Sequence, residues 1–100
     1  MVKNYKLSPA AIISIEAIVA YTDETFGLNQ TAAYIAGIES SFDLLVKFPG
    51  IGAAAFEVKT GLRRYRYQSH YIFYTEQGEH IRIEDIVHVS RSIRPDLFDT

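Results

Sequence analysis

The chain has 100 residues, 48% of them hydrophobic, a formal net charge of −2 and no cysteine. This length and apolar content predict a single globular domain over residues 1–100, built around one core. The absence of cysteine excludes disulfides and thiolate metal sites and fits the cytoplasm. The N-terminus shows no signal-peptide pattern. The longest low-charge run, Leu7 to Tyr21, is too short and too interrupted to span a bilayer, so we expect no membrane partner.

The first part of the sequence predicts a strand and then a helix. Residues Val2–Leu7 alternate as a strand does, and Ser8-Pro9 combines an N-cap with proline at the first helical position. Gly27 ends this helix, whose apolar stripe at helical spacing comprises Ile12, Ile15, Ile18 or Val19, and Thr22 or Phe26.

A second helix is predicted directly after the first. The short connection through Gly27 makes the two helices an antiparallel hairpin, with Asn29 as the expected N-cap and Pro49-Gly50 as the stop signal. The apolar residues of this helix repeat at three- and four-residue steps: Tyr34, Ile35, Ile38, Phe42, Leu45 and Phe48.

The second half of the chain predicts a loop, three strands and a tail. Pro49–Thr60 is rich in small residues and is expected to be a loop, and Glu76–Glu79 is expected to be a hairpin turn with a late glycine. Arg91–Thr100 has little periodicity. The strands are expected at about Leu62–Gln68, His70–Thr75 and His80–Ser90.

The order of these elements predicts an α+β fold, a two-layer β-α-α-β-β-β sandwich. The helix hairpin packs on one face of an antiparallel sheet, and the other face is left for solvent or a partner. The sheet residues that need an apolar partner, and therefore the helices, are Tyr65, Tyr67, Ile72, Tyr74, Ile81 and Ile83.

Positive charge is concentrated in Gly61–Tyr74, where three arginines precede an aromatic run. Alternation at period two sends Arg64 and Arg66 to one sheet face and Arg63 to the other. Guanidinium groups bind carboxylate or phosphate through a planar fork of donors, which indicates an anionic partner; the alternative is an ordinary solvated sheet face. Because the net charge is negative and the tyrosines suit strand packing, we expect no direct nucleic-acid partner.

One of the three histidines is a candidate functional residue. His88, near the end of the last predicted strand, could be a general base, a hydrogen-bond partner or a satisfied half-buried side chain. His70 lies beside a turn, where exposure or a capping role is expected, and His80 has no special role. None has a cysteine or carboxylate at ligand spacing, so neither a metal nor a cofactor is expected.

Five segments occur in order along almost the whole chain: Ser8–Ala11, Phe48–Gly52, Gly61–Tyr65, His70–Tyr74 and Ile81–His88. Together they resemble the ParE branch of the ParE/RelE toxin superfamily of bacterial toxin–antitoxin modules. The resemblance implies a cytoplasmic toxin without catalytic chemistry. It also implies a hetero-oligomer with a ParD-like antitoxin, and DNA gyrase as the target, bound by protein–protein contacts. The candidate partner-binding residues are Arg63, Arg64, Arg66, His88 and Arg91.

Two alternatives remain at this stage. The sister RelE branch cleaves messenger RNA on the ribosome, and the catalytic candidates for such an endoribonuclease would be Arg64, Arg66, His88 and Arg91. The sequence after Arg91 contains no Tyr, His or Lys, which departs from the RelE pattern and argues against this activity. The other alternative is a degenerate, non-toxic member that serves only as an interaction module.

Overall fold

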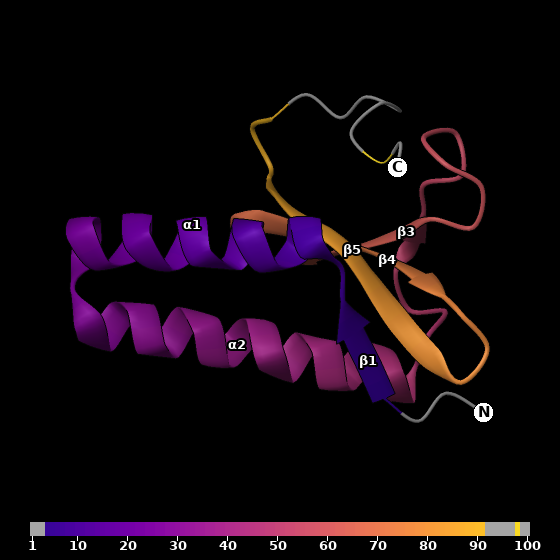
Figure 1. Cartoon of the computed structure of the whole chain (residues 1–100), viewed down its shortest axis with the longest axis horizontal. Coiled ribbons are helices and arrows are strands. Elements are labelled where there is room, and N and C mark those ends of the chain that lie inside the picture. The colour runs from indigo at the N-terminus through magenta and orange to yellow at the C-terminus, as the bar shows by residue number, and fades with distance from the viewer. Residues whose placement is uncertain (1–3, 92–97, 99–100) are drawn as a thin grey trace.

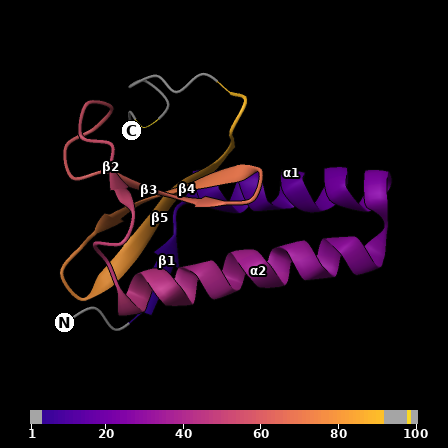
Figure 2. The same ribbon diagram turned by 180° about the vertical axis from the view of Figure 1, so that it is seen from behind.

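The computed structural model describes residues 4–91 and Phe98. The helix hairpin, α1 and α2, covers one face of a five-stranded sheet (Figures 1 and 2), which confirms the predicted α+β two-layer architecture. The strand order is β1-β5-β4-β3-β2. The bounds are β1 Asn4–Leu7, α1 Pro9–Phe26, α2 Leu28–Lys47, β2 Ala53–Ala54, β3 Arg63–Tyr67, β4 His70–Glu76 and β5 His80–His88.

The sheet differs from the predicted one in two respects. It is mixed rather than antiparallel, because β1 joins the edge of β5 in parallel, with Tyr5 opposite Ile81. It also has a fifth strand, β2, within the segment expected to be a loop, where Ala53 and Ala54 pair with β3. Two small side chains allow this segment to approach the sheet edge, but two residues are too few to give a recognisable alternation.

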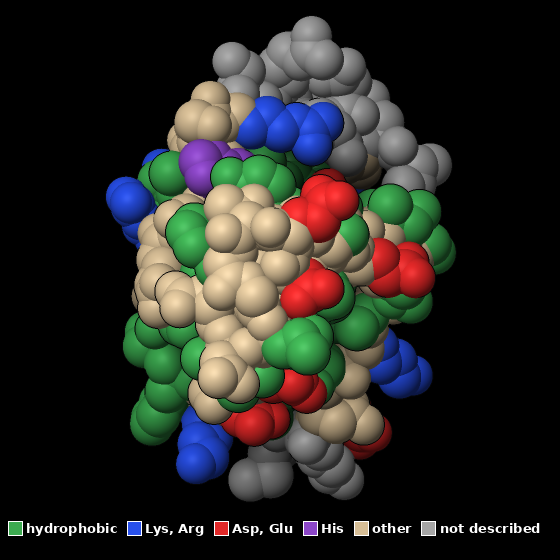
Figure 3. All heavy atoms as spheres, turned by 90° about the vertical axis from the view of Figure 1, so that its left-hand side faces the viewer, with side chains coloured by type: hydrophobic (Ala, Val, Ile, Leu, Met, Phe, Trp, Pro, Cys, Tyr) green, Lys and Arg blue, Asp and Glu red, His purple; other side chains and the backbone are tan. Residues whose placement is uncertain are grey.

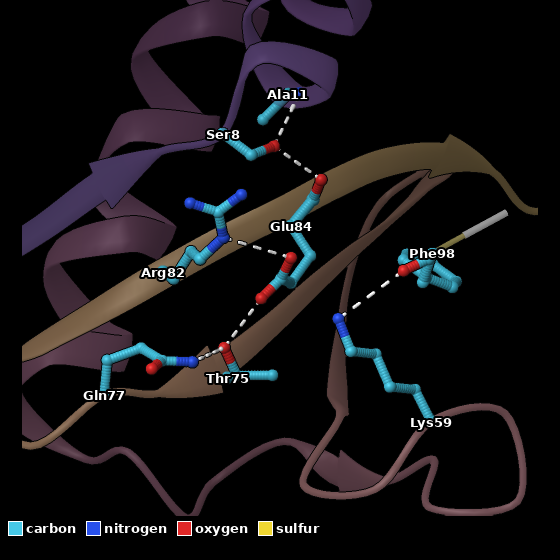
Figure 4. Close-up of polar contacts among 8 residues, drawn as sticks. All are labelled: Ser8, Ala11, Lys59, Thr75, Gln77, Arg82, Glu84 and Phe98. Carbon is cyan, nitrogen blue, oxygen red and sulfur yellow. Dashed lines mark hydrogen bonds and ion pairs between the residues drawn. The ribbon is translucent and has the colours of Figure 1, made fainter. Parts of the chain in front are cut away.

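The start of α1 follows the predicted capping pattern and is fixed to the sheet. The Ser8 hydroxyl oxygen accepts a hydrogen bond from the Ala11 amide at 3.0 Å and donates to the Glu84 carbonyl at 2.7 Å (Figure 4). The Ser8 amide also donates to the Ile83 carbonyl at 3.0 Å. One buried side chain therefore satisfies an open helix amide and ties α1 to β5.

A β-bulge interrupts the pairing of β4 with β5. Opposite Phe73 and Tyr74 the register skips one residue of β5, and that extra residue is Glu84. Its buried carboxylate accepts hydrogen bonds from Thr75 Oγ1 at 2.8 Å and from Arg82 Nε at 3.2 Å (Figure 4). These bonds satisfy a carboxylate that would otherwise be costly to bury.

The main core lies between the hairpin and the sheet. Ile38, Phe42 and Leu45 of α2 and Ile18 of α1 are buried against the sheet, which confirms the predicted central stripe of each helix. Ala11 of α1, which was not predicted, is buried with them. The strand side chains predicted to face the helices all pack in this cluster, fully or partly buried: Tyr65, Tyr67, Ile72, Tyr74, Ile81 and Ile83.

The predicted stripes are wrong at two positions. Ile12 is 47% exposed, because Ala11 takes the inward position at the start of α1, and Phe48, the C-cap just beyond the end of α2, is 57% exposed. Of the alternatives Thr22 and Phe26, Thr22 is buried, and Phe26 is 62% exposed where the hairpin extends beyond the strands (Figure 1). Asn29 lies inside α2, and the N-cap is Gly27, which makes no side-chain hydrogen bond. Across the described residues, no helix combines the length and hydropathy needed to cross a membrane.

The opposite sheet face, which the sequence left open, is partly covered. The segment from Ala55 to Leu62 folds over it, held by a hydrogen bond from the Ala55 amide to the Leu62 carbonyl at 2.8 Å. Together with Phe98 these two residues bury Phe73 and Val87 in a second apolar cluster. Of the predicted tail, residues 92–97 and 99–100 lie outside the described part of the chain.

Candidate partner-binding site

The register of the sheet divides the predicted site residues between its two faces. Arg64 and Arg66 lie opposite Phe73 and Tyr71, on the face away from the hairpin. His88 lies opposite His70 and shares the hairpin face. The sheet therefore separates Arg64 and Arg66 from His88.

Arg64 and Arg66 form the cationic group. The Arg64 guanidinium carbon lies 4.8 Å from the centre of the Tyr71 ring, a cation–π contact that holds a half-buried side chain in place. Arg66 is exposed, and its Nε donates to the Gln68 carbonyl at 2.8 Å. Within residues 4–91 the structure contains one ion pair, Arg82–Glu84, so neither arginine has a carboxylate partner there. Two oriented positive charges remain available to an acidic ligand.

The other two predicted arginines lie elsewhere. Arg63, opposite Tyr74, donates from Nη1 to the Gly52 carbonyl at 2.9 Å and lies 5.6 Å from the Phe56 ring centre. These contacts make Arg63 a brace for the loop after α2. Arg91 is exposed just beyond β5, where its amide donates to the His88 carbonyl at 3.0 Å.

The two histidines form a pair that the sequence did not predict. Their ring centroids are 5.3 Å apart at an interplanar angle of 88°. His88 is exposed, and its Nδ1 contacts Ser90 Oγ at 2.7 Å. His70, expected to be exposed or to cap a turn, is half-buried, and its Nδ1 lies 2.6 Å from the Tyr34 hydroxyl. In the part of the chain that the structure describes, no three potential metal ligands come together.

The β-bulge creates this pair. Between the β4–β5 turn and the bulge, Glu76 pairs with Ile81. On the other side of the bulge, each β4 residue pairs with a β5 residue one position further along the chain than this register would give. His88 therefore lies opposite His70. If the same sequence continued the register of Glu76 and Ile81 without a bulge, His70 would face Val87, and His88 would point to the other side of the sheet. A sequence signal for this pairing would have to be a signal for the bulge, and the adjacent carboxylates Glu84 and Asp85 within β5 are only a weak one.

Burial shifts the pKa values of His70 and of the Tyr34 hydroxyl beside it. Burial, and next the nearby His88, lower the pKa of His70 below its usual value. Burial raises the pKa of the Tyr34 hydroxyl, and hydrogen bonding from Ser69 acts in the opposite direction. Both groups are therefore held neutral near pH 7.

The histidine pair lines an open cleft of about 560 Å³ between the hairpin and the β3–β4 turn. We call this the histidine cleft; its walls include Tyr21 and Phe26 of α1. Figure 3 looks at the end of the molecule where the hairpin turns, and shows histidine beside hydrophobic side chains, with acidic side chains on another part of that face. None of the residues lining the cleft is Asp, Glu, Lys or Arg.

Comparisons with known proteins agree with this architecture. Residues 5–93 match the family model described as the ParE toxin of the type II toxin–antitoxin system parDE. Toxin ParE1 of Caulobacter vibrioides is 28% identical over 95 residues, covering 95% of this chain and 98% of that protein. Toxin ParE1 of Mycobacterium tuberculosis is 34% identical over 79 residues, covering 79% of this chain and 81% of that protein.

The fold is also found in a solved structure described as a chromosomal ParDE TA system from P. aeruginosa. It superposes with a TM-score of 0.76 at 18% sequence identity, over 89% of this chain and 97% of that one. Since the family model spans nearly the whole sequence and the fold agrees, the chain belongs to the ParE toxin family of type II toxin–antitoxin systems.

Proposed function

We propose that this protein inhibits DNA gyrase by protein–protein binding in the cytoplasm, blocking replication, and that a ParD-like antitoxin neutralises it. Membership of the ParE family supports this proposal. The observation that carries it is the separation of the predicted site residues. Arg64 and Arg66 lie on one face of the sheet, and His88 lies on the other.

This separation argues for binding rather than RNA cleavage. An endoribonuclease needs a proton acceptor and phosphate-stabilising cations within hydrogen-bond reach of one scissile bond. The proton acceptor among the catalytic candidates is His88, and the sheet lies between it and two of the three candidate cations, Arg64 and Arg66. A protein partner that extends over a large surface has no such requirement, and it can use the two groups independently.

The cationic group suits an acidic partner. Arg64 is fixed by Tyr71 and Arg66 by the β3–β4 turn, so both charges are oriented before a partner arrives. Preformed positive charge speeds the association of an acidic segment and selects against basic ones. We assign Arg64 and Arg66 to partner contact, with Arg91 as a further cation and Arg63 as the brace of the adjoining loop.

A gyrase supercoiling assay tests the proposal. Purified protein is added with and without the product of the adjacent reading frame, the expected antitoxin. We expect loss of supercoiling or trapped cleaved DNA, reversed by the antitoxin. Full supercoiling at large excess would contradict the gyrase assignment, and truncated transcripts in a translation reaction would then favour the endoribonuclease.

A matched pair of variants tests the role of the arginines. Arg64→Gln with Arg66→Gln removes two positive charges from the sheet face, and Lys6→Gln with Lys47→Gln removes two exposed charges elsewhere. We expect the arginine variant to weaken partner binding about tenfold or more and the lysine variant to change it little. Equal effects would show that only the net charge matters.

A further inference from the structure

The hydrogen bonds of His88 fix which ring nitrogen carries its proton. The Ser90 amide donates to His88 Nδ1 at 3.1 Å, and an amide N–H can only donate. Nδ1 is therefore the acceptor of the neutral ring, and the proton is on Nε2. His88 thus presents a hydrogen-bond donor on the edge away from Ser90.

The ring proton of His70 is also on Nε2. The Tyr34 hydroxyl lies 2.6 Å from His70 Nδ1 but 3.5 Å from the Tyr67 carbonyl. An O–H donor at 3.5 Å makes almost no hydrogen bond, so the hydroxyl proton is directed to Nδ1. Nδ1 of His70 is again the acceptor, and Nε2 carries the ring proton.

The histidine cleft therefore contains two adjacent imidazole N–H donors. Among the described residues neither Nε2 has a protein partner. Both rings line the cleft, together with Ser69 and Gln68, and no acidic side chain lies in its walls to satisfy them. The facing wall is apolar: Tyr21 and Phe26 are 65% and 62% exposed.

This combination defines the chemistry of an occupant. Two neighbouring donors match the two oxygens of a carboxylate, and the aromatic wall matches an apolar body that carries it. The cleft is open to solvent rather than enclosed, whereas small-molecule sites bury most of the surface of their ligand. A protein segment with apolar residues flanking an Asp or Glu covers the aromatic wall and reaches the donors at once.

We propose that the antitoxin inserts an acidic side chain, carried on an apolar segment, into the histidine cleft, where its carboxylate accepts hydrogen bonds from Nε2 of His70 and of His88. The inference rests on the proposed function and adds a position at which the antitoxin is recognised. It separates two kinds of recognition on opposite sheet faces. The arginines attract acidic segments in general. The histidine cleft binds one specific carboxylate that is flanked by apolar residues.

Binding of a carboxylate to the two histidines should depend on pH. The groups around the pair are the Tyr34 hydroxyl from α2, Tyr67 from β3, the Tyr21 hydroxyl from α1 and Arg91 just beyond β5. In the free protein burial disfavours the protonated form of His70. A bound carboxylate favours that form, so the complex takes up protons and its affinity rises as the pH falls.

Isothermal titration of the full-length protein with the product of the adjacent reading frame, from about pH 8 to about pH 5.5, tests the proposal. His88→Gln and His70→Gln keep a donor near the Nε2 position but cannot titrate. We expect them to retain most of the affinity at pH 8 and to reduce its rise at low pH. His88→Leu removes the donor and should weaken binding about tenfold or more at every pH. His80→Gln, at the other end of β5, is the matched control.

The outcomes separate this inference from the proposed function. Binding whose pH dependence is the same in the wild type, the glutamine variants and the His80 control would overturn the inference and leave the antitoxin assignment intact. Absence of binding at every pH would overturn both. Circular dichroism of each variant checks that a loss of binding is not a loss of fold.

Discussion

Replacing Tyr74 with phenylalanine isolates one hydroxyl group on which the loop after α2 depends. The Tyr74 side chain is fully buried between the hairpin and the sheet. Its hydroxyl donates to the Pro49 carbonyl at 2.8 Å and accepts from the Gly52 amide at 2.9 Å. The substitution keeps the ring and its apolar contacts but removes both hydrogen bonds.

The two bonds set the expected magnitude. Gly52 is buried, so its amide would lose its partner without access to water, at a cost of about 1–3 kcal/mol, and the lost bond to the Pro49 carbonyl adds about 1 kcal/mol. The free energy of unfolding should therefore fall by about 2–4 kcal/mol. For a domain of this size that lowers Tm by about 10–20 °C.

Urea unfolding followed by circular dichroism measures this difference, and Tyr71→Phe is the control. Tyr71 lies on the same strand and is half-buried, but its hydroxyl makes no hydrogen bond within residues 4–91. The control should change stability by less than about 0.5 kcal/mol. Equal losses in the two variants would refute the reasoning, because the cost would then come from the loss of any tyrosine hydroxyl.

Three further substitutions test other parts of the fold. Ser8→Ala removes both the helix cap and the bond to the Glu84 carbonyl, and should cost about 1–3 kcal/mol in urea unfolding, whereas Ser8→Thr should recover most of it. Gly37→Ala would gain about 1 kcal/mol in a free helix, but its Cβ would overlap the Tyr67 phenol. Gly37→Ala should therefore lower the free energy of unfolding of the wild type and raise that of a Tyr67→Ala variant. A change of the same sign in both proteins would contradict this contact. Burial and a neighbouring histidine hold the folded-state pKa of His70 below its usual value of 6.5. The unfolded chain is therefore protonated first, and the free energy of unfolding should fall as the pH drops below about 6.5, less steeply in His70→Gln.

The sequence was sufficient wherever a local signal decides the structure. Ser8 caps α1, Gly27 ends it, and α2 stops just before Pro49-Gly50, because capping and termination depend on a few neighbouring residues. The apolar alternation of the strands identified the sheet face that the hairpin covers, and the hairpin turn at Glu76–Glu79 was confirmed. The ordered segments also identified the ParE family, which the comparisons confirm.

The tertiary structure decided what depends on distant partners. Nothing near Leu7 encodes that β1 pairs in parallel with β5, and nothing in the alanine-rich loop encodes that Ala53 and Ala54 reach the edge of β3. The cover over the second sheet face likewise depends on Phe98 meeting Phe73 across the chain. Alternation in one strand shows which residues share a face, but it does not show what covers that face.

The candidate site shows the same division most clearly. Alternation correctly separated Arg64 and Arg66 from Arg63, because it is a property of one strand. The pairing of His70 with His88 depends on one extra residue, Glu84, in the opposite strand. A single inserted residue exchanges the two faces of every position beyond it, so composition and spacing determined the fold and its cationic face, and only the folded register decided that two histidines share a cleft.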